Sequence, residues 1–134
     1  MPQNKKRNQS VWEGGNGFPY AAFVDMLPVG VILLSADLGV VSASRHCSVL
    51  LGADIGGDVT KFMFADDRDD FRFQVARLRL SQKPVPEVDI RFLLPDGGLA
   101  WMSVATMLVP DAATPLLLCL TNIDERKRVE VERR

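Results

Sequence analysis

The sequence is poor in the residues that most often carry catalysis, metal binding or disulfide chemistry. Its 134 residues include one histidine, His46, and two cysteines, Cys47 and Cys119. Each cysteine lies in a separate apolar stretch, which does not match the paired spacing of zinc sites or redox motifs. We therefore expect two reduced, buried thiols, no metal site and a cytoplasmic protein.

The sequence also has no excess of either charge and no apolar run of membrane length. It carries 16 basic against 17 acidic residues, so its net charge of −1 favours neither nucleic acid nor an anionic membrane surface. Every apolar run is far shorter than the ~20 residues of a membrane-spanning helix. Residues 1–17 lack the apolar core of a signal peptide, and we interpret them as a flexible tail. The chain length predicts one domain with a single core.

What the chain does contain is a regular succession of strand and helix signals. The segment 87–92 alternates apolar and polar residues, which predicts a strand with one wet face, while Phe71, Val75 and Leu78 have the spacing of a helix. Strands are expected at 29–35, 40–44, 87–92, 100–109 and 116–120. Helices are expected at 18–27, 45–51 and 67–81, with a loop at 54–57 and a further helical turn at 58–64. This order predicts an α+β fold in which helices cover one face of an antiparallel sheet.

The last strand leads directly into a charged helix. The segment 116–120 is apolar, the run stops at Asn122, and we expect Asp124 to cap the following helix by accepting backbone N–H groups. Residues 123–134 are polar nearly all round, so this helix cannot fold back onto the core by itself. Such a geometry is typical of a module that reports to another part of a protein.

Five short segments, in this order, resemble the motifs of the PAS domain, the sensory and dimerisation module of bacterial signalling proteins. Residues 26–34 resemble its entry into the first strand, 47–52 its "xxLLG" helix, 64–68 its "HPEDR" segment, 95–101 its "DGxxxW" hairpin and 122–128 its "DITERKR" exit. The resemblance extends from about Phe23 to Arg128, which is most of the chain.

The resemblance implies a specific architecture and organisation. The sheet would have five antiparallel strands in the order 2-1-5-4-3, with the helices on one face. The chain would divide into the tail at 1–17, a PAS-like sensory domain at 18–122 and the start of a signalling helix at 123–134. The family further implies a homodimer and an output domain in the same protein, such as a histidine kinase or a cyclic-dinucleotide enzyme.

The departures from the family pattern bear on capping and on cofactors. Asn122 and Asp124 replace the Asp and Thr of the exit motif, and Phe64 replaces the usual His. Asp and Thr are both competent helix N-caps, so the replacement keeps the capping function of the exit motif. Cys47 lies outside the motif by which light-sensing members bond a flavin, and His46 lies outside the helix that would supply a heme ligand. Neither heme nor flavin is supported, and the cofactor stays open.

Two arrangements that suggest chemistry do not meet its requirements. The acidic run 66–70 fails as a calcium loop because Arg68 stands where an oxygen ligand is needed and Phe71 where a glycine is needed. We interpret it as a solvated helix N-terminus. His46 lies at a strand-to-helix junction with no third group to orient its ring. No catalytic residue is expected.

The inward positions of the expected fold are almost all apolar. They are candidates for a ligand site between the long helix and the sheet, and the set is Leu51, Phe62, Phe71, Val75, Ile90, Phe92, Val104, Thr106 and Leu118. A ligand there would be small and mostly apolar, with Thr106 as the polar group that orients it. The alternative is that Phe62, Phe71 and Phe92 fill the space and leave no site.

The outward positions are also unusually apolar, which predicts a partner surface. The expected dimer interface comprises Phe23, Trp101, Ala105, Met107, Leu117 and Cys119, and the expected signal relay comprises Asn122, Ile123 and Asp124. The function predicted from these features is a non-catalytic sensory and dimerisation module that acts through its C-terminal helix. Two alternatives stay open, namely a small α+β enzyme such as an isomerase or hydrolase, and a pure interaction domain with a filled cavity.

Overall fold

The structure is a computed structural model that describes residues 26–109 and 115–132. Phe23, the expected tail at 1–17 and most of the expected helix at 18–27 lie outside the described residues. None of the helices in the described part is long and apolar enough to cross a membrane.

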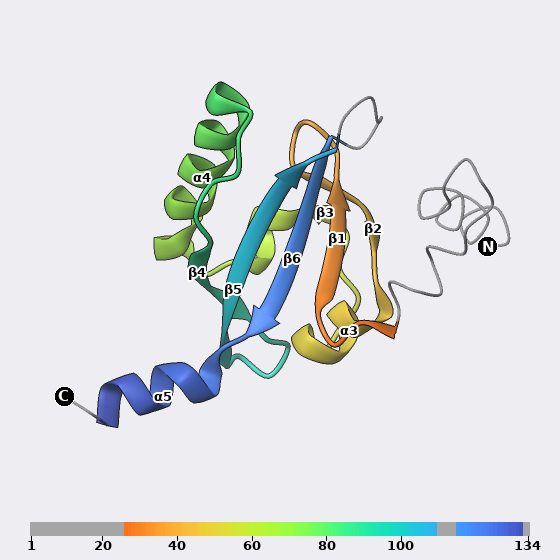
Figure 1. The fold of residues 1–134 in the computed structure, drawn as a ribbon. Helices are drawn as coiled ribbons and strands as arrows, with labels where there is room; N and C mark the ends of the chain where they lie inside the picture. The colour runs from red at the N-terminus through yellow and green to blue at the C-terminus, as the bar shows by residue number, and fades with distance from the viewer. Residues whose placement is uncertain (1–25, 110–114, 133–134) are drawn as a thin grey trace, which may run out of the picture.

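The described residues form one antiparallel sheet with the order β3-β2-β1-β6-β5-β4 (Figure 1). The strands are β1 (Gly30–Leu34), β2 (Gly39–Ala43), β3 (Gly57–Asp58), β4 (Val88–Leu93), β5 (Leu99–Leu108) and β6 (Leu116–Asn122). The five longer strands confirm the expected order. The two-residue strand β3 corrects the expected count, because residues assigned to a loop and a helical turn pair with Gly39 and Val40 at the sheet edge. Both β3 residues are exposed, so no apolar alternation signals this strand.

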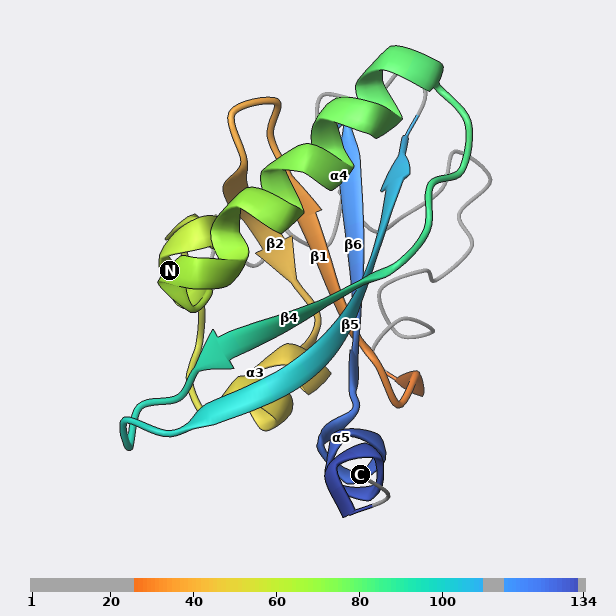
Figure 2. The ribbon, with the colours of Figure 1, turned by 90° about the vertical axis from the view of Figure 1, so that its left-hand side faces the viewer.

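The helical elements other than the last cover one face of the sheet, as expected for an α+β fold. They are α3 (Arg45–Leu51), the 3-10 turns η1 (Val59–Phe62) and η2 (Ala65–Asp67), and α4 (Arg68–Ser81). Figure 2 shows α4 lying across the sheet. α3 ends at Gly52, whose φ of 73° is the left-handed cap that the glycine predicts. α5 (Asp124–Glu132) instead leaves the domain at the end of β6 (Figure 1).

The core lies between α4, α3 and the inner face of the sheet. In β5, Met102, Val104 and Thr106 are buried, while Trp101 and Ala105 are half-buried, as the predicted parity of this strand requires. Ser103, which the same parity places outward, is buried as well. β1 is buried along its whole length, as expected for a central strand that reads as a continuous apolar run. The inner face is therefore packed, and the outer face of β5 and β6 is only partly covered.

Candidate functional site

The residues expected to line a ligand cavity do come together, but mostly by packing against one another. Seven of the nine belong to the buried core cluster, namely Leu51, Phe71, Val75, Ile90, Phe92, Val104 and Leu118. Phe62 packs against this cluster from its edge. Phe71 on α4 and Phe92 on β4 have no exposed surface at all, and both belong to the core cluster, so their rings pack inside it.

Thr106, expected to orient a ligand, already has an intramolecular partner. Its hydroxyl donates to Oε1 of Gln74 at 2.8 Å. The Gln74 amide nitrogen donates in turn to the carbonyls of Pro86 at 3.1 Å and Val104 at 2.9 Å. Gln74 was missing from the predicted inward set, although its position three residues after Phe71 places it on the same face of α4. The polar capacity of Thr106 is thus used to fasten α4 to the sheet.

Two of the expected ligand residues border a small apolar hollow beside the core. Leu51 and Phe62 line it together with Ile55, Leu93 and Pro95, and its volume is about 170 Å³. This volume is below the usual range of small-ligand sites. The hollow lies where α3, η1 and the β4–β5 hairpin meet.

The junction between β6 and α5 is held by a set of backbone hydrogen bonds to Trp101. The Trp101 N–H donates to Oδ1 of Asp124 at 2.7 Å, and the Trp101 carbonyl accepts from the Ile123 N–H at 2.9 Å. Ile123 is only 7% exposed, so it anchors the start of α5 in the domain. Two of the three predicted relay residues, Ile123 and Asp124, therefore bond to one residue of the neighbouring strand, and Asn122 is joined to them through Asp124.

The predicted capping role of Asp124 is wrong. Asp124 is already the first residue of α5, and its carboxylate bonds across to β5 instead of to its own helix. Asn122 instead binds a backbone group at the start of α5, because its side-chain oxygen accepts the Asp124 N–H at 3.0 Å. The physical reason is a one-residue shift of the helix start, which turns a capping carboxylate into a link between α5 and β5.

Two cations lie over the Trp101 ring. The Arg91 guanidinium is 5.0 Å from the ring centroid and the Lys127 ammonium 4.7 Å, both within the range of cation–π attraction. Lys127 also reaches Asp89 of β4 at 2.7 Å, and this hydrogen bond raises the pKa of Lys127. Arg126 pairs with the same carboxylate at 3.2 Å. α5 is therefore tied to both β4 and β5 by its first turn.

The network continues from Arg91 to the start of α4. Asp67 accepts from Nε, from a terminal nitrogen and from the backbone N–H of Arg91 at 2.9, 2.8 and 2.7 Å. The Arg91 guanidinium, mainly through these side-chain hydrogen bonds, holds the pKa of Asp67 below its usual value. The interpretation of the acidic run as solvated is wrong for Asp67, whose side chain is only 8% exposed. Arg91 stacks on Phe64 as well, 4.3 Å from the ring centroid.

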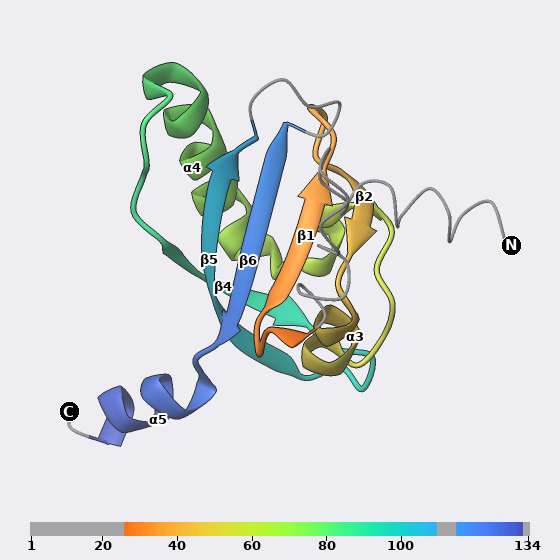
Figure 3. The same cartoon turned by 45° about the vertical axis from the view of Figure 1, so that its right-hand side comes forward.

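The outer sheet face carries the expected apolar strip across β5 and β6. Ala105 stands opposite Cys119 and Met107 opposite Leu117 in the strand register, so the four side chains are neighbours. Met107 is 48% exposed and the other three are half-buried. Figure 3 shows this face, with β5, β6 and β1 in front of α4. Trp101 lies on the same face, nearer to α5.

The cysteine and histidine residues of the described part form no reactive arrangement. Cys47 is buried against β1, where its thiol contacts the Val31 carbonyl, and burial raises the pKa of this thiol. The expected burial of both thiols is wrong for Cys119, which is only half-buried. Among the described residues, no group of three or more His, Cys, Asp or Glu side chains is placed to hold a metal ion.

Comparison with known proteins identifies the fold. No protein-family model matches the chain, and no curated protein matches its sequence. Among solved structures, a PAS domain from Colwellia psychrerythraea superposes with a TM-score of 0.66 at 17% identity, covering 79% of this chain and 95% of that one.

Two further structures come from signalling proteins. A sensory box histidine kinase/response regulator from Burkholderia thailandensis matches with a TM-score of 0.64 at 16% identity, covering 85% of this chain and 88% of that one. The N-terminal domain of a diguanylate cyclase with a PAS/PAC sensor from Marinobacter aquaeolei matches with a TM-score of 0.61 at 16% identity, covering 74% of this chain and 98% of that one. The chain thus has the PAS fold, which confirms the fold expected from the five sequence segments.

Proposed function

We propose that the chain is a non-catalytic sensory and dimerisation module of a bacterial, cytoplasmic signalling protein. It passes its signal through α5 to an output domain in the same protein, a histidine kinase or a cyclic-dinucleotide enzyme. The observation that carries the proposal is the attachment of α5 to Trp101, by hydrogen bonds through Asp124 and Ile123 and by the Lys127 ammonium over its ring. The kinase and cyclase contexts of the structural neighbours support the kind of output.

The physical route runs from the core to the helix through two neighbouring strands. Val104 and Leu120 are paired across β5 and β6, and both are fully buried in the core. A change in core packing therefore displaces these strands together, because interiors are close-packed. Trp101 and Ile123 lie at the end of the same two strands and carry the displacement to α5. In a dimer, two such helices would turn against each other.

The proposed dimer is tested on the outer face of the sheet. Met107→Glu should raise the dimer dissociation constant by at least about a hundredfold, because it places an unpaired charge in the apolar strip with Leu117. Sedimentation equilibrium measures the change. Leu80→Glu is the matched control, since Leu80 is an exposed apolar residue of α4 on the other side of the sheet. If the wild-type protein were monomeric at high concentration, the proposed dimerisation would be contradicted.

Asp124→Ala should loosen α5 from the domain by about 1 kcal/mol, because the Trp101 N–H loses its charged acceptor at a solvent-exposed site. Leu93 and Val131 are both exposed and can carry spin labels. Double electron–electron resonance measures the distance between the two labels and so reports the orientation of α5. We expect the distance distribution to broaden in the variant.

Asp124→Asn is the control, because its amide oxygen still accepts the Trp101 N–H. It should keep the narrow distribution. In the full-length protein, Asp124→Ala should reduce the response of the output activity to its stimulus while Asp124→Asn retains it. Equal regulation in both variants and wild type would place the signal path somewhere other than at this junction.

The filled core favours a second candidate, an interaction domain that binds no small molecule. Phe71 and Phe92 occupy the space where a ligand would lie. Native mass spectrometry of protein purified from its source separates the two, because it reports bound small molecules and the subunit count together. A bound small molecule favours the ligand-sensing role, and its absence favours the interaction domain.

A further inference from the structure

β5 extends beyond the point at which its neighbour β4 begins. Pairing between the two strands starts at Val88 and Val104, whereas β5 continues to Leu108. On its other side β5 stays paired with β6 as far as the Leu108–Leu116 pair. The part of β5 that follows Val104 is therefore an open sheet edge on the side of β4.

The strand parity shows which backbone groups face this edge. The Trp101 carbonyl and the Val109 N–H bond toward the β6 side, so the odd-numbered residues of β5 point there. The N–H and C=O groups of the even-numbered residues Thr106 and Leu108 consequently point toward the open edge. An unpaired edge of this kind is a template for another strand.

The sequence prevents β4 from covering this edge. If the register of Val88 and Val104 continued, Pro86 would stand opposite Thr106 and Pro84 opposite Leu108. Proline has no N–H to donate to a ladder. The Gln74 amide binds the carbonyls of Pro86 and Val104 and so fixes the chain where pairing stops.

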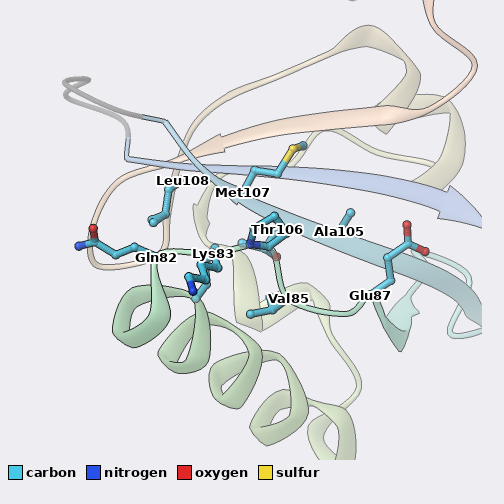
Figure 4. A pocket seen from close by; sticks show the side chains of 10 residues that line it. Gln82, Lys83, Val85, Glu87, Ala105, Thr106, Met107 and Leu108 are labelled. Carbon is cyan, nitrogen blue, oxygen red and sulfur yellow. The ribbon is translucent and has the colours of Figure 1, made fainter.

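The open edge borders a groove of about 380 Å³. Figure 4 shows the segment from Gln82 to Glu87 running along one side and β5 along the other. The groove lining is mostly apolar, and its charged residues are one cation, Lys83, and one anion, Glu87, which Figure 4 shows at separate places along the segment 82–87. The Glu87 carboxylate accepts the Ser103 hydroxyl at 2.6 Å, which fixes its position.

We propose that this groove binds an extended segment of a partner protein as an added strand, antiparallel to β5. The segment's backbone pairs with Thr106 and Leu108, and its direction places an acidic residue beside Lys83 and, four residues later, a basic residue beside Glu87. Positions opposite Thr106 and Leu108 face Leu78 and are apolar.

The occupant is a peptide rather than a compact small molecule because the groove offers backbone donors and acceptors at strand spacing. It is a single chain rather than the sheet edge of a second copy because residues 82–87 wall the far side.

The probe is a pool of blocked pentapeptides with Glu first, Lys last, Val, Ile or Leu at the second and fourth positions, and Ser or Thr in the middle. It is tested with the 134-residue protein by NMR titration and amide hydrogen exchange. We expect binding by members of the pool, with protection of the Thr106 and Leu108 amides. The tightest member is then remade with methylated backbone nitrogens at the second and fourth positions, which should weaken binding about 30-fold through the loss of two hydrogen bonds.

Lys83→Glu should weaken binding of the same peptide about fivefold, and Lys61→Glu, on an exposed turn outside the groove, should leave it unchanged. Equal binding of the methylated peptide would show that the peptide backbone does not pair with β5 and would overturn the proposal. Failure of every member of the pool to bind at millimolar concentration would overturn it as well. Neither result bears on α5, so the proposed sensory function is tested separately.

Discussion

Asp67→Ala should lower the free energy of unfolding by about 3 kcal/mol, measured by urea denaturation at neutral pH. The substitution removes the acceptor of three hydrogen bonds from Arg91 and leaves that guanidinium without its partner at a site where its side chain is only 29% exposed. Breaking one side of a buried ion pair typically costs 3–5 kcal/mol. The low end of that range applies because Arg91 keeps some solvent and its contacts with Phe64 and Trp101.

The pH dependence of stability tests the same ion pair independently. The hydrogen bonds from Arg91 hold the pKa of Asp67 below its usual 3.8, so the unfolded chain binds the proton more tightly than the folded protein. The stabilisation is therefore complete above the unfolded-state pKa and is lost as pH falls through the lower folded-state pKa. The difference between wild type and Asp67→Ala should shrink in that acidic range.

Asp69→Ala is the matched control for this ion pair. Asp69 is in the same acidic run and pairs with Arg72 at 3.3 Å, but its side chain is 96% exposed. Surface pairs of this kind contribute little, so its loss should change stability by less than about 0.5 kcal/mol. If the two alanine variants were equally stable, Asp67 would not be the buried partner of Arg91.

The strand order and the core could be predicted because they depend on period and polarity. The apolar run at β6 and the alternation of β4 each specify a strand. The parity of β5 assigned Val104 inward and Met107 outward from the sequence alone. A one-residue error would have reversed every side chain of that strand, so its confirmation fixes the whole outer strip.

The polar contacts of the site could not be predicted because they depend on distances between segments far apart in sequence. Nothing in the acidic run distinguishes Asp67 from Asp66 or Asp69, and its partner Arg91 is 24 residues away. The role of Asp124 depends on whether α5 begins one residue earlier or later, which helix propensities do not resolve.

The open edge of β5 could be predicted from the sequence only in part. Pro84 and Pro86 are visible in the sequence as residues that interrupt a strand. That they stand opposite Leu108 and Thr106 follows only from the register of Val88 with Val104. The prolines therefore predict where β4 begins, and the register is needed to show which part of β5 is left open.

Phe71→Ala should lower the free energy of unfolding by about 4 kcal/mol, the second large effect we expect. Phe71 is fully buried and belongs to the core cluster with Val75 on α4 and Ile90 on β4. Removing a buried phenyl ring loses its transfer free energy and leaves a cavity, which together cost about 3–5 kcal/mol. Phe73→Ala, on the same helix but at a residue 66% exposed, controls for helix propensity and should change stability by less than about 1 kcal/mol.

The same pair of variants decides whether the core has room for an apolar ligand. A dry cavity lined by apolar side chains binds benzene, and binding to the folded state alone raises the melting temperature. We expect benzene to raise the melting temperature of Phe71→Ala and to leave wild type and Phe73→Ala unchanged, because the Phe71 and Phe92 rings fill the space in the native protein. A rise in the wild type would mean that the core already accommodates a small apolar molecule between α4 and the sheet. Displacement of that molecule would then be the event that shifts β5 and β6, and through Trp101 turns α5.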